Sequence, residues 1–367
     1  MKSLFDQTSL AGMRLKNRFV RSATYDGFAD KSGHMTEELF QVYEDLAKGG
    51  VGTIITGLTY VSDLEEPLPR QMGIYDDSFI AEYEKLTKMC HRHDTRIIMQ
   101  LVCMGSQTSR TDDKVMWGPS AVEDLRYKTT PQEMTVQDIH FVQMAFADAA
   151  LRAKQAGFDG VQLHGAHGYL LSKFLTPYYN RRTDDYGGSI GNRAKILLET
   201  YEAIREKVGP DYPVLVKINC DDFMEQGMSF ADCRYICETL ARMGIGAIEI
   251  SGGIGSSRPN EGTIRMIKTA EQESYFQPYA VEIARQISVP VILVGGNREF
   301  ASLTEILNQT GLEYFALCRP LIRESDLINR WQKGDRGQAK CVSCNQCFRI
   351  GGTTCVFNGR QKTSART

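Results

Sequence analysis

The chain has 367 residues, and its 43 Lys and Arg residues nearly balance its 45 Asp and Glu residues, which gives a formal net charge of −2. Hydrophobic residues make up 42% of the chain and charged residues 24%, so there is apolar material for a large core and a disordered protein is excluded. The near-neutral charge also excludes a strongly basic nucleic-acid-binding protein.

The apolar segments and the N-terminus give no sign of a membrane. The longest segment without a charged residue, Gly49–Ser62, is too short to span a bilayer. The first ten residues include Lys2 and Asp6 and no apolar stretch, so we expect no signal peptide. Six of the ten cysteines are scattered and four are clustered near the C-terminus. That distribution indicates reduced thiols and a cytoplasmic protein rather than a secreted disulfide scaffold.

Short apolar runs alternate with amphipathic segments along most of the chain. The runs are rich in Val, Ile and Phe, and several are almost continuously hydrophobic, which is typical of parallel strands buried on both faces. Eight strands are predicted, at Arg18–Ser22, Gly52–Thr56, Arg96–Val102, Gly160–His164, Pro213–Asn219, Ala247–Ser251, Pro290–Val294 and Tyr314–Leu317.

Helix signals lie between these strands. Thr36 is expected to cap a helix over Glu37–Lys48, which Gly49 ends. Apolar residues recur every three or four positions over Val142–Ala153 and over Leu197–Val208, as on one face of a helix. Two further helix starts match the capping-box pattern of a Ser followed three residues later by an acidic residue: Ser229 with Asp232, and Ser302 with Glu305.

Eight strand–helix units predict an α/β fold, a (β/α)₈ TIM barrel over residues 1–335, followed by a short Cys-rich tail over residues 336–367. A doubly wound open sheet is the alternative. Thr108–Met134 has two prolines and little periodicity, which predicts a long loop after the third strand, where barrels place ligand-binding elements. The polar stretch Asp335–Lys340 is expected to connect the barrel to the tail.

Two histidines and a tyrosine follow the fourth predicted strand. His164 and His167 come at the carboxyl end of that strand, with Tyr169 two residues further on. In a barrel this end is the catalytic face. Two imidazoles there can donate hydrogen bonds to one oxygen and polarise a carbonyl, and a phenol can deliver a proton. Structural histidines are the alternative, but three such residues together favour a catalytic site.

These residues belong to a longer segment that resembles the old yellow enzyme family, FMN-dependent ene reductases on a TIM barrel. The resemblance is carried by His164–Leu170 (HGAHGYL) and by Asn180–Ser189 (NRRTDDYGGS) with Asn192-Arg193 after it. Weaker matches to the family's first strand and flavin-contacting strand ends lie at Leu15–Ser22, Met99–Leu101, Val294–Gly296 and Arg319-Pro320.

The resemblance implies an FMN site at the strand ends. Gly295 and Gly296 after the seventh strand, with Arg319 after the eighth, are expected to bind the phosphate. Gln100 is expected to hydrogen-bond the pyrimidine edge of the flavin. Lys217 stands where the family places a cation near flavin N1, and a positive charge there stabilises the anionic reduced flavin.

Other positions are expected to line the flavin or to alter its surroundings. Ala23, Thr24 and Gly57 are expected to line it from the ends of the first two strands. Tyr25 stands where family members often carry Cys or Thr, at a position that tunes the flavin potential. Cys318 replaces the Gly that usually precedes Arg319. The backbone N–H is kept, but the added side chain makes the fit of the cofactor tighter.

The expected reaction transfers a hydride from NAD(P)H to FMN and then to the β-carbon of an activated alkene. His164 and His167 hold the acceptor oxygen, and Tyr169 protonates the α-carbon. We expect a small-molecule alkene as substrate, a homo-oligomer, and no nucleic-acid or membrane partner. The alternatives are a flavin dehydrogenase or demethylase that passes electrons out through a metal cluster, and a redox or metal sensor that uses the tail.

The tail holds Cys341, Cys344, Cys347 and Cys355 in a C-x2-C-x2-C-x7-C pattern. Four thiolates can hold a [4Fe–4S] cluster or a zinc ion. The tail resembles the [4Fe–4S] motif of dienoyl-CoA reductases and trimethylamine dehydrogenase, but two of its gaps are shorter than theirs. Because the sequence stops at Thr367, we expect no FAD and NAD(P)-binding domains like those of these relatives, and we expect a cluster to be structural or to take electrons from an external donor. Iron–sulfur is favoured, and zinc or a metal-free tail are the alternatives.

Overall fold

The computed structural model describes residues 1–108, 113–349 and 352–358 of the chain. Eight parallel strands form a ring, closed because the first barrel strand pairs with both the second and the last. This confirms the predicted (β/α)₈ barrel and all eight strand positions. The barrel strands are β3 (Phe19–Arg21), β4 (Thr53–Tyr60), β6 (Arg96–Val102), β9 (Gly160–Gly165), β10 (Val214–Asn219), β11 (Ala247–Ser251), β12 (Val291–Leu293) and β13 (Tyr314–Leu317).

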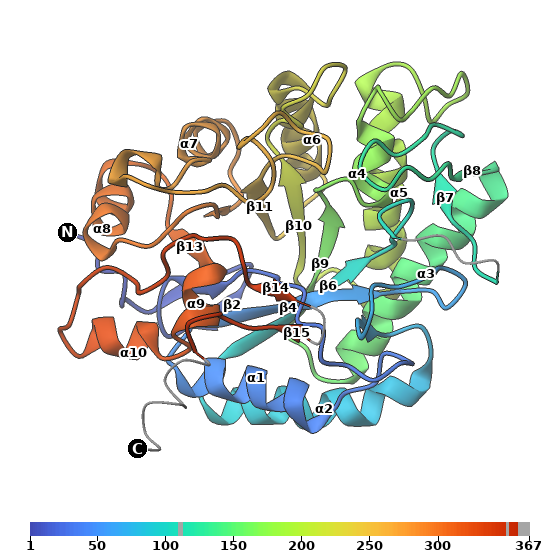
Figure 1. Ribbon diagram of the computed structural model, residues 1–367. Coiled ribbons are helices and arrows are strands. Elements are labelled where there is room, and N and C mark those ends of the chain that lie inside the picture. Colours follow the sequence, from blue (N-terminus) through green and yellow to red (C-terminus); the bar gives the residue numbers. More distant parts are fainter. Residues whose placement is uncertain (109–112, 350–351, 359–367) are drawn as a thin grey trace.

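Helices surround the barrel on its outside (Figure 1). Every residue of β4, β9, β10 and β11 is buried, because helices cover the outer face and side chains fill the interior. The helices are α1 (Glu37–Lys48), α2 (Ile80–Arg92), α3 (Val136–Gln155), α4 (Leu170–Leu175), α5 (Ile190–Val208), α6 (Phe230–Arg242), α7 (Gln277–Gln286), α8 (Phe300–Gln309), α9 (Arg319–Arg323) and α10 (Leu327–Gln332), with short 3₁₀ segments at Asp77–Phe79 and Ala270–Gln272.

Two of the predicted helix starts are confirmed and one is wrong. The Thr36 side chain accepts a hydrogen bond from the Leu39 N–H at 3.2 Å and caps α1. Ser229 forms the expected capping box with Asp232 at the start of α6. Ser302, however, lies inside α8, which begins at Phe300 without a side-chain cap. The turn after β12 sets the start of α8, so the Ser302 motif falls within a helix that has already begun.

An N-terminal hairpin covers the amino end of the barrel. It joins β1 (Thr8–Leu10) to β2 (Met13–Leu15) through Ala11 and Gly12, whose φ angles of 50° and 83° are those of a tight type I′ turn. A Cβ on Gly246, just before β11, would stand 2.9 Å from the Ala11 Cβ. The hairpin therefore packs against the barrel's amino end, and the opposite end remains for a site.

The predicted loop after the third strand and the C-terminal tail both lie at the carboxyl end. Among the described residues, the loop contains only the two-residue strands β7 (Trp117–Gly118) and β8 (Gln132–Glu133). The tail forms a hairpin of β14 (Phe348–Arg349) and β15 (Gly352–Thr353), and the Thr353 N–H donates to the Asp26 carbonyl at 2.7 Å. The remaining strand, β5 (Met72–Gly73), pairs with β4.

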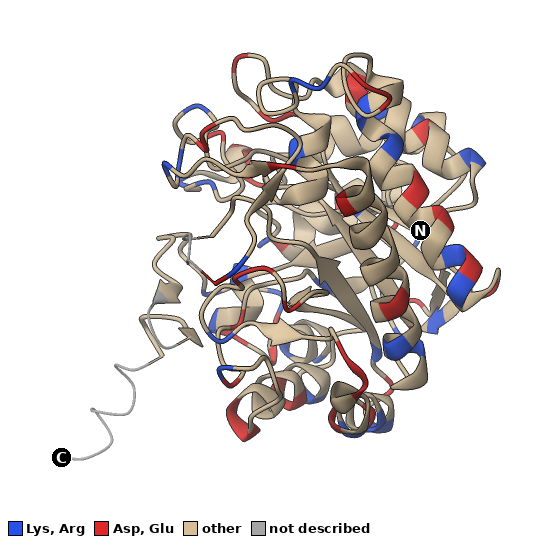
Figure 2. Ribbon diagram, turned by 90° about the vertical axis from the view of Figure 1, so that its right-hand side faces the viewer, with Lys and Arg blue, Asp and Glu red and all other residues tan. Residues whose placement is uncertain are grey.

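Positions of basic and of acidic residues alternate along the outer helices (Figure 2), and the net charge is near neutral. In the part of the chain that the structure describes, none of the helices combines the length and apolar character that a bilayer crossing needs.

Candidate active site

A cavity of about 350 Å³ opens at the carboxyl ends of the barrel strands. Its position is the one that enzymes of this architecture use for catalysis. The structure brings together in its wall all the predicted catalytic and cofactor-contacting residues except Gly57: Ala23, Thr24, Tyr25, Gln100, His164, His167, Tyr169, Lys217, Gly295, Gly296, Cys318 and Arg319.

Gly57 lies behind the cavity wall. Its N–H donates to the Tyr43 hydroxyl at 2.9 Å. A Cβ on Gly57 would stand 2.8 Å from both the Asp26 carboxylate and the Thr24 carbonyl. The glycine thus allows β4 to pass close behind the residues that follow β3, and it supports the wall without being part of it.

The two histidines form a buried, electrically neutral pair. Their rings are 5.1 Å apart and nearly perpendicular. Burial is the main reason that the pKa of each lies well below its ordinary value, and the positive charge of Lys217 lowers both further. The Nδ1 atom of His164 is buried and has no hydrogen-bond partner in the part of the chain that the structure describes. Leaving a buried ring nitrogen unpaired is costly, so a ligand atom is its natural partner.

His167 is held in a strained backbone conformation. Its φ is +66°, in the left-handed region that is unfavourable for a non-glycine residue. The Asn219 side-chain oxygen accepts a hydrogen bond from the His167 N–H at 3.2 Å, and the ring Nε2 bonds the Ser251 hydroxyl at 2.7 Å. These contacts from the ends of β10 and β11 fix the ring and leave its Nδ1 for another partner.

Tyr169 stands beside this pair. Its ring centroid is 4.7 Å from that of His164, and its hydroxyl has no hydrogen-bond partner among the described residues. Burial raises the pKa of the phenol well above its ordinary value, so the group stays protonated at neutral pH. A neutral phenol with a free O–H next to two hydrogen-bond donors can deliver a proton.

Lys217 belongs to a polar network inside the barrel. Its Nζ lies 3.1 Å from the fully buried Glu249 carboxylate and donates to the Ser22 hydroxyl at 2.8 Å. The other Glu249 oxygen accepts from the Gln162 amide at 2.8 Å, and Gln162 in turn accepts from the Gln100 amide nitrogen at 2.8 Å. This chain of bonds uses the Gln100 N–H group and leaves its carbonyl oxygen for a donor in the cavity.

The sequence analysis missed Gln162 and Glu249. Both interrupt otherwise apolar strands, in the segments GVQLHG and AIEIS. A polar side chain in a strand buried on both faces needs a partner inside the barrel, so this pattern could have revealed the network. It also missed Arg126 and Tyr127 of the long loop, which line the cavity.

Gly295 and Gly296 follow β12 with φ angles of 106° and 83°, which only glycine adopts readily. A Cβ on Gly295 would meet the Phe276 ring at 2.6 Å, and one on Gly296 would meet the Tyr275 ring at 2.9 Å. Within the described residues, the backbone N–H of Gly296 has no acceptor. Arg319 lines the same part of the cavity and donates to the Arg265 carbonyl at 2.9 Å. An unpaired N–H beside a guanidinium suits an anion.

The two positions that depart from the family pattern, Cys318 and Tyr25, both line the cavity. The Cys318 thiol lies 3.0 Å from the Thr24 hydroxyl, and Tyr25 bonds the Pro69 carbonyl through its hydroxyl. The tail covers this region, since the Thr353 hydroxyl donates to the Tyr25 carbonyl.

The four tail cysteines gather near Cys318. Burial, followed by the charges of Cys318 and the other tail thiols, raises the pKa of Cys347 to about 12. Within residues 1–108, 113–349 and 352–358, however, no group of three or more His, Cys, Asp or Glu side chains is placed to hold a metal ion. The thiols as placed do not fit a cluster or a zinc ion, and the tail would have to close around either one.

The fold and the cavity define an enzyme of the (β/α)₈-barrel class with its active site at the carboxyl ends of the strands. The chain belongs to the NADH:flavin oxidoreductase / NADH oxidase family, whose model matches residues 3–338. The resemblance to the old yellow enzyme family and the prediction of an NAD(P)H:flavin oxidoreductase are thereby confirmed at the level of the family.

Relatives of this chain include shorter and longer proteins. The NADH oxidase of Thermoanaerobacter brockii is 32% identical over 348 residues, which cover 94% of this chain and 53% of that protein. An NADPH dehydrogenase of Geobacillus sp. (strain WCH70) is 32% identical over 321 residues, 87% of this chain and 91% of that protein. A solved 2-naphthoyl-CoA reductase, in complex with 2-naphthoyl-CoA, matches with a TM-score of 0.86 at 25% identity over 94% of this chain and 54% of that one. The chain thus spans about half the length of the first and third proteins.

The cavity residues fit FMN, which brings a phosphate, a polar ring edge and a flat apolar ring system. The Gly296 N–H and the Arg319 guanidinium suit the phosphate. The free carbonyl oxygen of Gln100 suits an N–H on the ring edge, and Lys217 supplies a buried positive charge beside it. Among the described residues, the Gly296 N–H and the Gln100 carbonyl oxygen have no other partner, which suits a site built for a ligand.

Proposed function

We propose that this chain is an FMN-dependent oxidoreductase that reduces the C=C bond of activated alkenes with NAD(P)H. The observation that carries the proposal is the His164 Nδ1 on the cavity wall with the Tyr169 ring beside it, since neither the Nδ1 nor the Tyr169 hydroxyl has a hydrogen-bond partner among the described residues. FMN, when bound, supplies the hydride chemistry between the nicotinamide and the alkene.

The histidines hold the oxygen that activates the alkene. Because burial keeps both imidazoles neutral, each can donate one hydrogen bond without bringing a charge that would need a counter-ion. His164 uses its Nδ1, and His167, fixed by Ser251 and Asn219, uses its own. Donors that are already oriented stabilise the negative charge that develops on a carbonyl oxygen during addition to the β-carbon.

Tyr169 supplies the proton that the α-carbon needs. Its hydroxyl stays protonated because burial raises the pKa. It leads into α4, and the Lys173 N–H donates to the Tyr169 carbonyl at 2.9 Å, which fixes the backbone of the residue. We expect general-acid catalysis by a positioned phenol to contribute a factor of about 10² to 10⁴ to the rate.

The test separates the two half-reactions of the purified, FMN-loaded protein without oxygen. NADH or NADPH should bleach the flavin, and cyclohexenone should restore its colour. Tyr169→Phe should leave bleaching nearly as fast and slow the return of colour by about 10² or more. Failure to bind FMN, or a bleached flavin that no enone restores, would refute the proposal. Bleaching by an amine without NAD(P)H would instead support the dehydrogenase alternative.

We also propose that the tail takes up a metal centre, with [4Fe–4S] favoured and zinc the alternative. The support is the donor chemistry of four clustered thiols within fifteen residues of sequence. Iron, sulfide and zinc are to be measured in protein purified without oxygen, with the Cys344→Ser variant as control. About four iron and four sulfide per chain would support the cluster, and metal-free protein that takes up none on reconstitution would refute the proposal.

A further inference from the structure

The wall of the cavity is cationic. Arg126, Lys217, Arg298 and Arg319 line it, and among the described residues the lining contains no Asp or Glu. Three of these cations have partners. Lys217 pairs with Glu249, Arg298 with Glu273 at 2.8 Å, and Arg319 with a backbone carbonyl and the Asn345 side chain.

Arg126 is the exception. Its guanidinium makes no hydrogen bond or ion pair with the described residues, and its recorded contact is with the neighbouring Tyr127 ring, 5.5 Å from the ring centroid. Its stem passes Gly255, where a Cβ would stand 2.6 Å from the Arg126 Cδ. The absence of a side chain at Gly255 therefore lets Arg126 extend along the cavity wall.

A tight turn fixes the backbone of Arg126. One Asp124 carboxylate oxygen accepts from the N–H groups of Arg126 and Tyr127 at 2.8 and 2.7 Å. The other oxygen pairs with Lys173 of α4, and both side chains of that pair are almost fully buried. Tyr169 immediately precedes α4, so the proposed proton donor and Arg126 are linked through one rigid connection.

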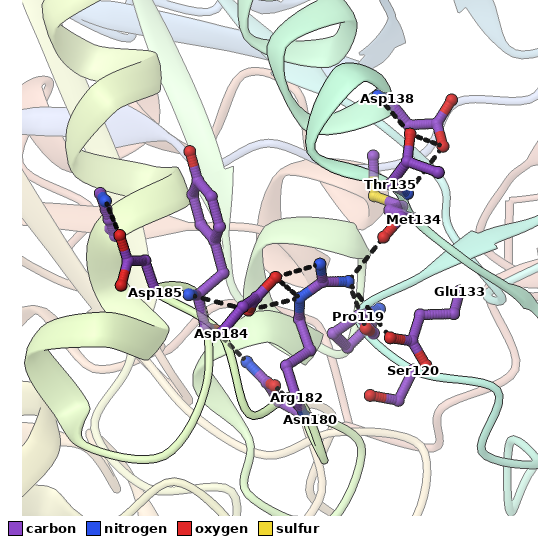
Figure 3. A network of polar contacts seen from close by, with 12 residues as sticks. Pro119, Ser120, Glu133, Met134, Thr135, Asp138, Asn180, Arg182, Asp184 and Asp185 are labelled. Atoms are coloured by element: carbon purple, nitrogen blue, oxygen red, sulfur yellow. Dashed lines mark hydrogen bonds and ion pairs between the residues drawn. The ribbon is translucent and has the colours of Figure 1, made fainter.

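A second brace holds the ends of the same loop. Figure 3 shows the Arg182 guanidinium pointing toward the carbonyls of Pro119 and Met134, to which it donates at 3.0 and 2.6 Å, and toward Asp184, which pairs with it at 2.5 Å. The loop is thus fixed at residues 119, 124 and 134, although its middle has little regular structure. An arginine on a loop without such contacts would lose rotamer and backbone freedom on binding a ligand. The contacts of Arg182 and Asp124 already fix the backbone, so only the rotamer entropy of Arg126 is lost on binding.

Arg126 and Tyr169 also act on each other electrostatically. Burial raises the pKa of Tyr169, and the positive charge of Arg126 opposes that rise. The unpaired cation therefore lies within electrostatic range of the atoms where we place proton transfer.

We propose that Arg126 is a specificity-determining residue that binds an anionic group, a carboxylate in the first instance, carried by the alkene substrate in addition to its activating oxygen. The inference rests on the proposed alkene reduction and names its substrate class: unsaturated ketones or thioesters that bear a separate negative group. A guanidinium binds a carboxylate through two parallel hydrogen bonds, which adds orientation to affinity. The phosphates of the pyridine nucleotide are the other source of this anionic chemistry, and the test separates the two.

The test compares β-acetylacrylate, which carries a carboxylate, with its uncharged methyl ester, and uses the acid-to-ester ratio in each variant so that their different intrinsic reactivities cancel. Reoxidation of the bleached flavin is measured by anaerobic stopped flow in the wild type, Arg126→Gln and Arg126→Lys. Lys128→Gln is the matched control, because Lys128 lies on the same loop, pairs with Glu123 at 3.7 Å and is not among the described residues that line the cavity. Levulinate and methyl levulinate, which cannot react, give binding constants by flavin absorbance.

The acid-to-ester ratio of the rate constants should fall about 10- to 100-fold in Arg126→Gln, the range for a hydrogen bond between charged groups. It should recover in part in Arg126→Lys and stay unchanged in Lys128→Gln. Equal losses for acid and ester would overturn the proposal. A loss confined to flavin bleaching by NAD(P)H would also overturn it and assign Arg126 to the nucleotide. If neither alkene restores the flavin in the wild type, the proposed function fails, and the levulinate constants alone decide the role of Arg126.

Discussion

Glu249 allows the buried network beneath the cavity to be tested in isolation. Its carboxylate is fully buried, and Lys217, with 3% of its side chain exposed, depends on it for its negative partner. Glu249→Gln leaves that ammonium group without a counter-charge inside the barrel. Removing one member of a buried ion pair costs about 3–5 kcal/mol. The Ser22 hydroxyl and the Gln162 amide both donate to Glu249, so the NH2 group of the new Gln side chain would face one of these donors. The free energy of unfolding should therefore fall by at least this amount.

A double-mutant cycle isolates the pair. Lys217→Met alone leaves Glu249 unpaired and should cost a similar amount, whereas the double variant contains neither charge of this pair and should recover most of the loss. We expect a coupling free energy of about 2 kcal/mol or more. The assay is urea denaturation of the flavin-free protein at neutral pH, followed by circular dichroism and tryptophan fluorescence. A Glu249→Gln loss below about 1 kcal/mol, or a double variant whose loss equals the sum of the single losses, would refute the reasoning.

Three further predictions concern stability and follow from single contacts. Gly49→Ala should cost about 1–3 kcal/mol by urea denaturation, because its Cβ would stand 1.8 Å from the Ser325 carbonyl, whereas the control Gly311→Ala, whose nearest neighbour is 3.9 Å away, should change stability by no more than about 0.5 kcal/mol. His164 has a pKa well below its ordinary value in the folded state, so the unfolded state binds the proton first and stability should fall as pH drops below about 6.5, by up to about 1.4 kcal/mol per pH unit. That part of the slope should vanish in His164→Gln, and an unchanged slope would contradict the assignment. Lys173→Met should cost about 3–5 kcal/mol, since it leaves a buried carboxylate unpaired. If Lys173→Met loses less than this and Lys173→Arg loses the same amount, the charge at this position is not required.

The barrel could be predicted because its signals are local. A strand buried on both faces reads as a continuous apolar run, and a helix start such as Thr36 carries its own cap. The predicted helix start at Ser302 was wrong because that prediction also used only a local pattern. A capping-box pattern carries no information about a turn that starts the helix two residues earlier. Local patterns fix each element, but the closure of the ring depends on the pairing of β3 with β4 and β13, which periodicity does not report.

The residues of the candidate site also fall into two groups, those that a local sequence pattern predicts and those that it does not. His164, His167 and Tyr169 are adjacent in sequence at a strand end, so their meeting in space follows from the strand itself. Glu249 reaches Lys217 from a neighbouring strand, and Arg126 comes from a loop without periodicity. No local pattern places such residues together. The loop was expected to carry ligand-binding elements, but which of its side chains would face the cavity depended on the Asp124 turn.

The second of the two segments that carry the family resemblance, Asn180–Ser189, acts mainly as a support. Asn180 donates to the carbonyls of Phe174 and Tyr186, both at 2.8 Å, and Arg182 ties down the ends of the long loop. None of the residues from 180 to 189 lines the cavity. The carbonyl groups of Pro119 and Met134 lie just beyond the short β7–β8 ladder and need donors from elsewhere, and a planar guanidinium can satisfy two of them at once. This segment fixes the loop's backbone without lining the cavity, and we propose that substrate selection falls to residues such as Arg126.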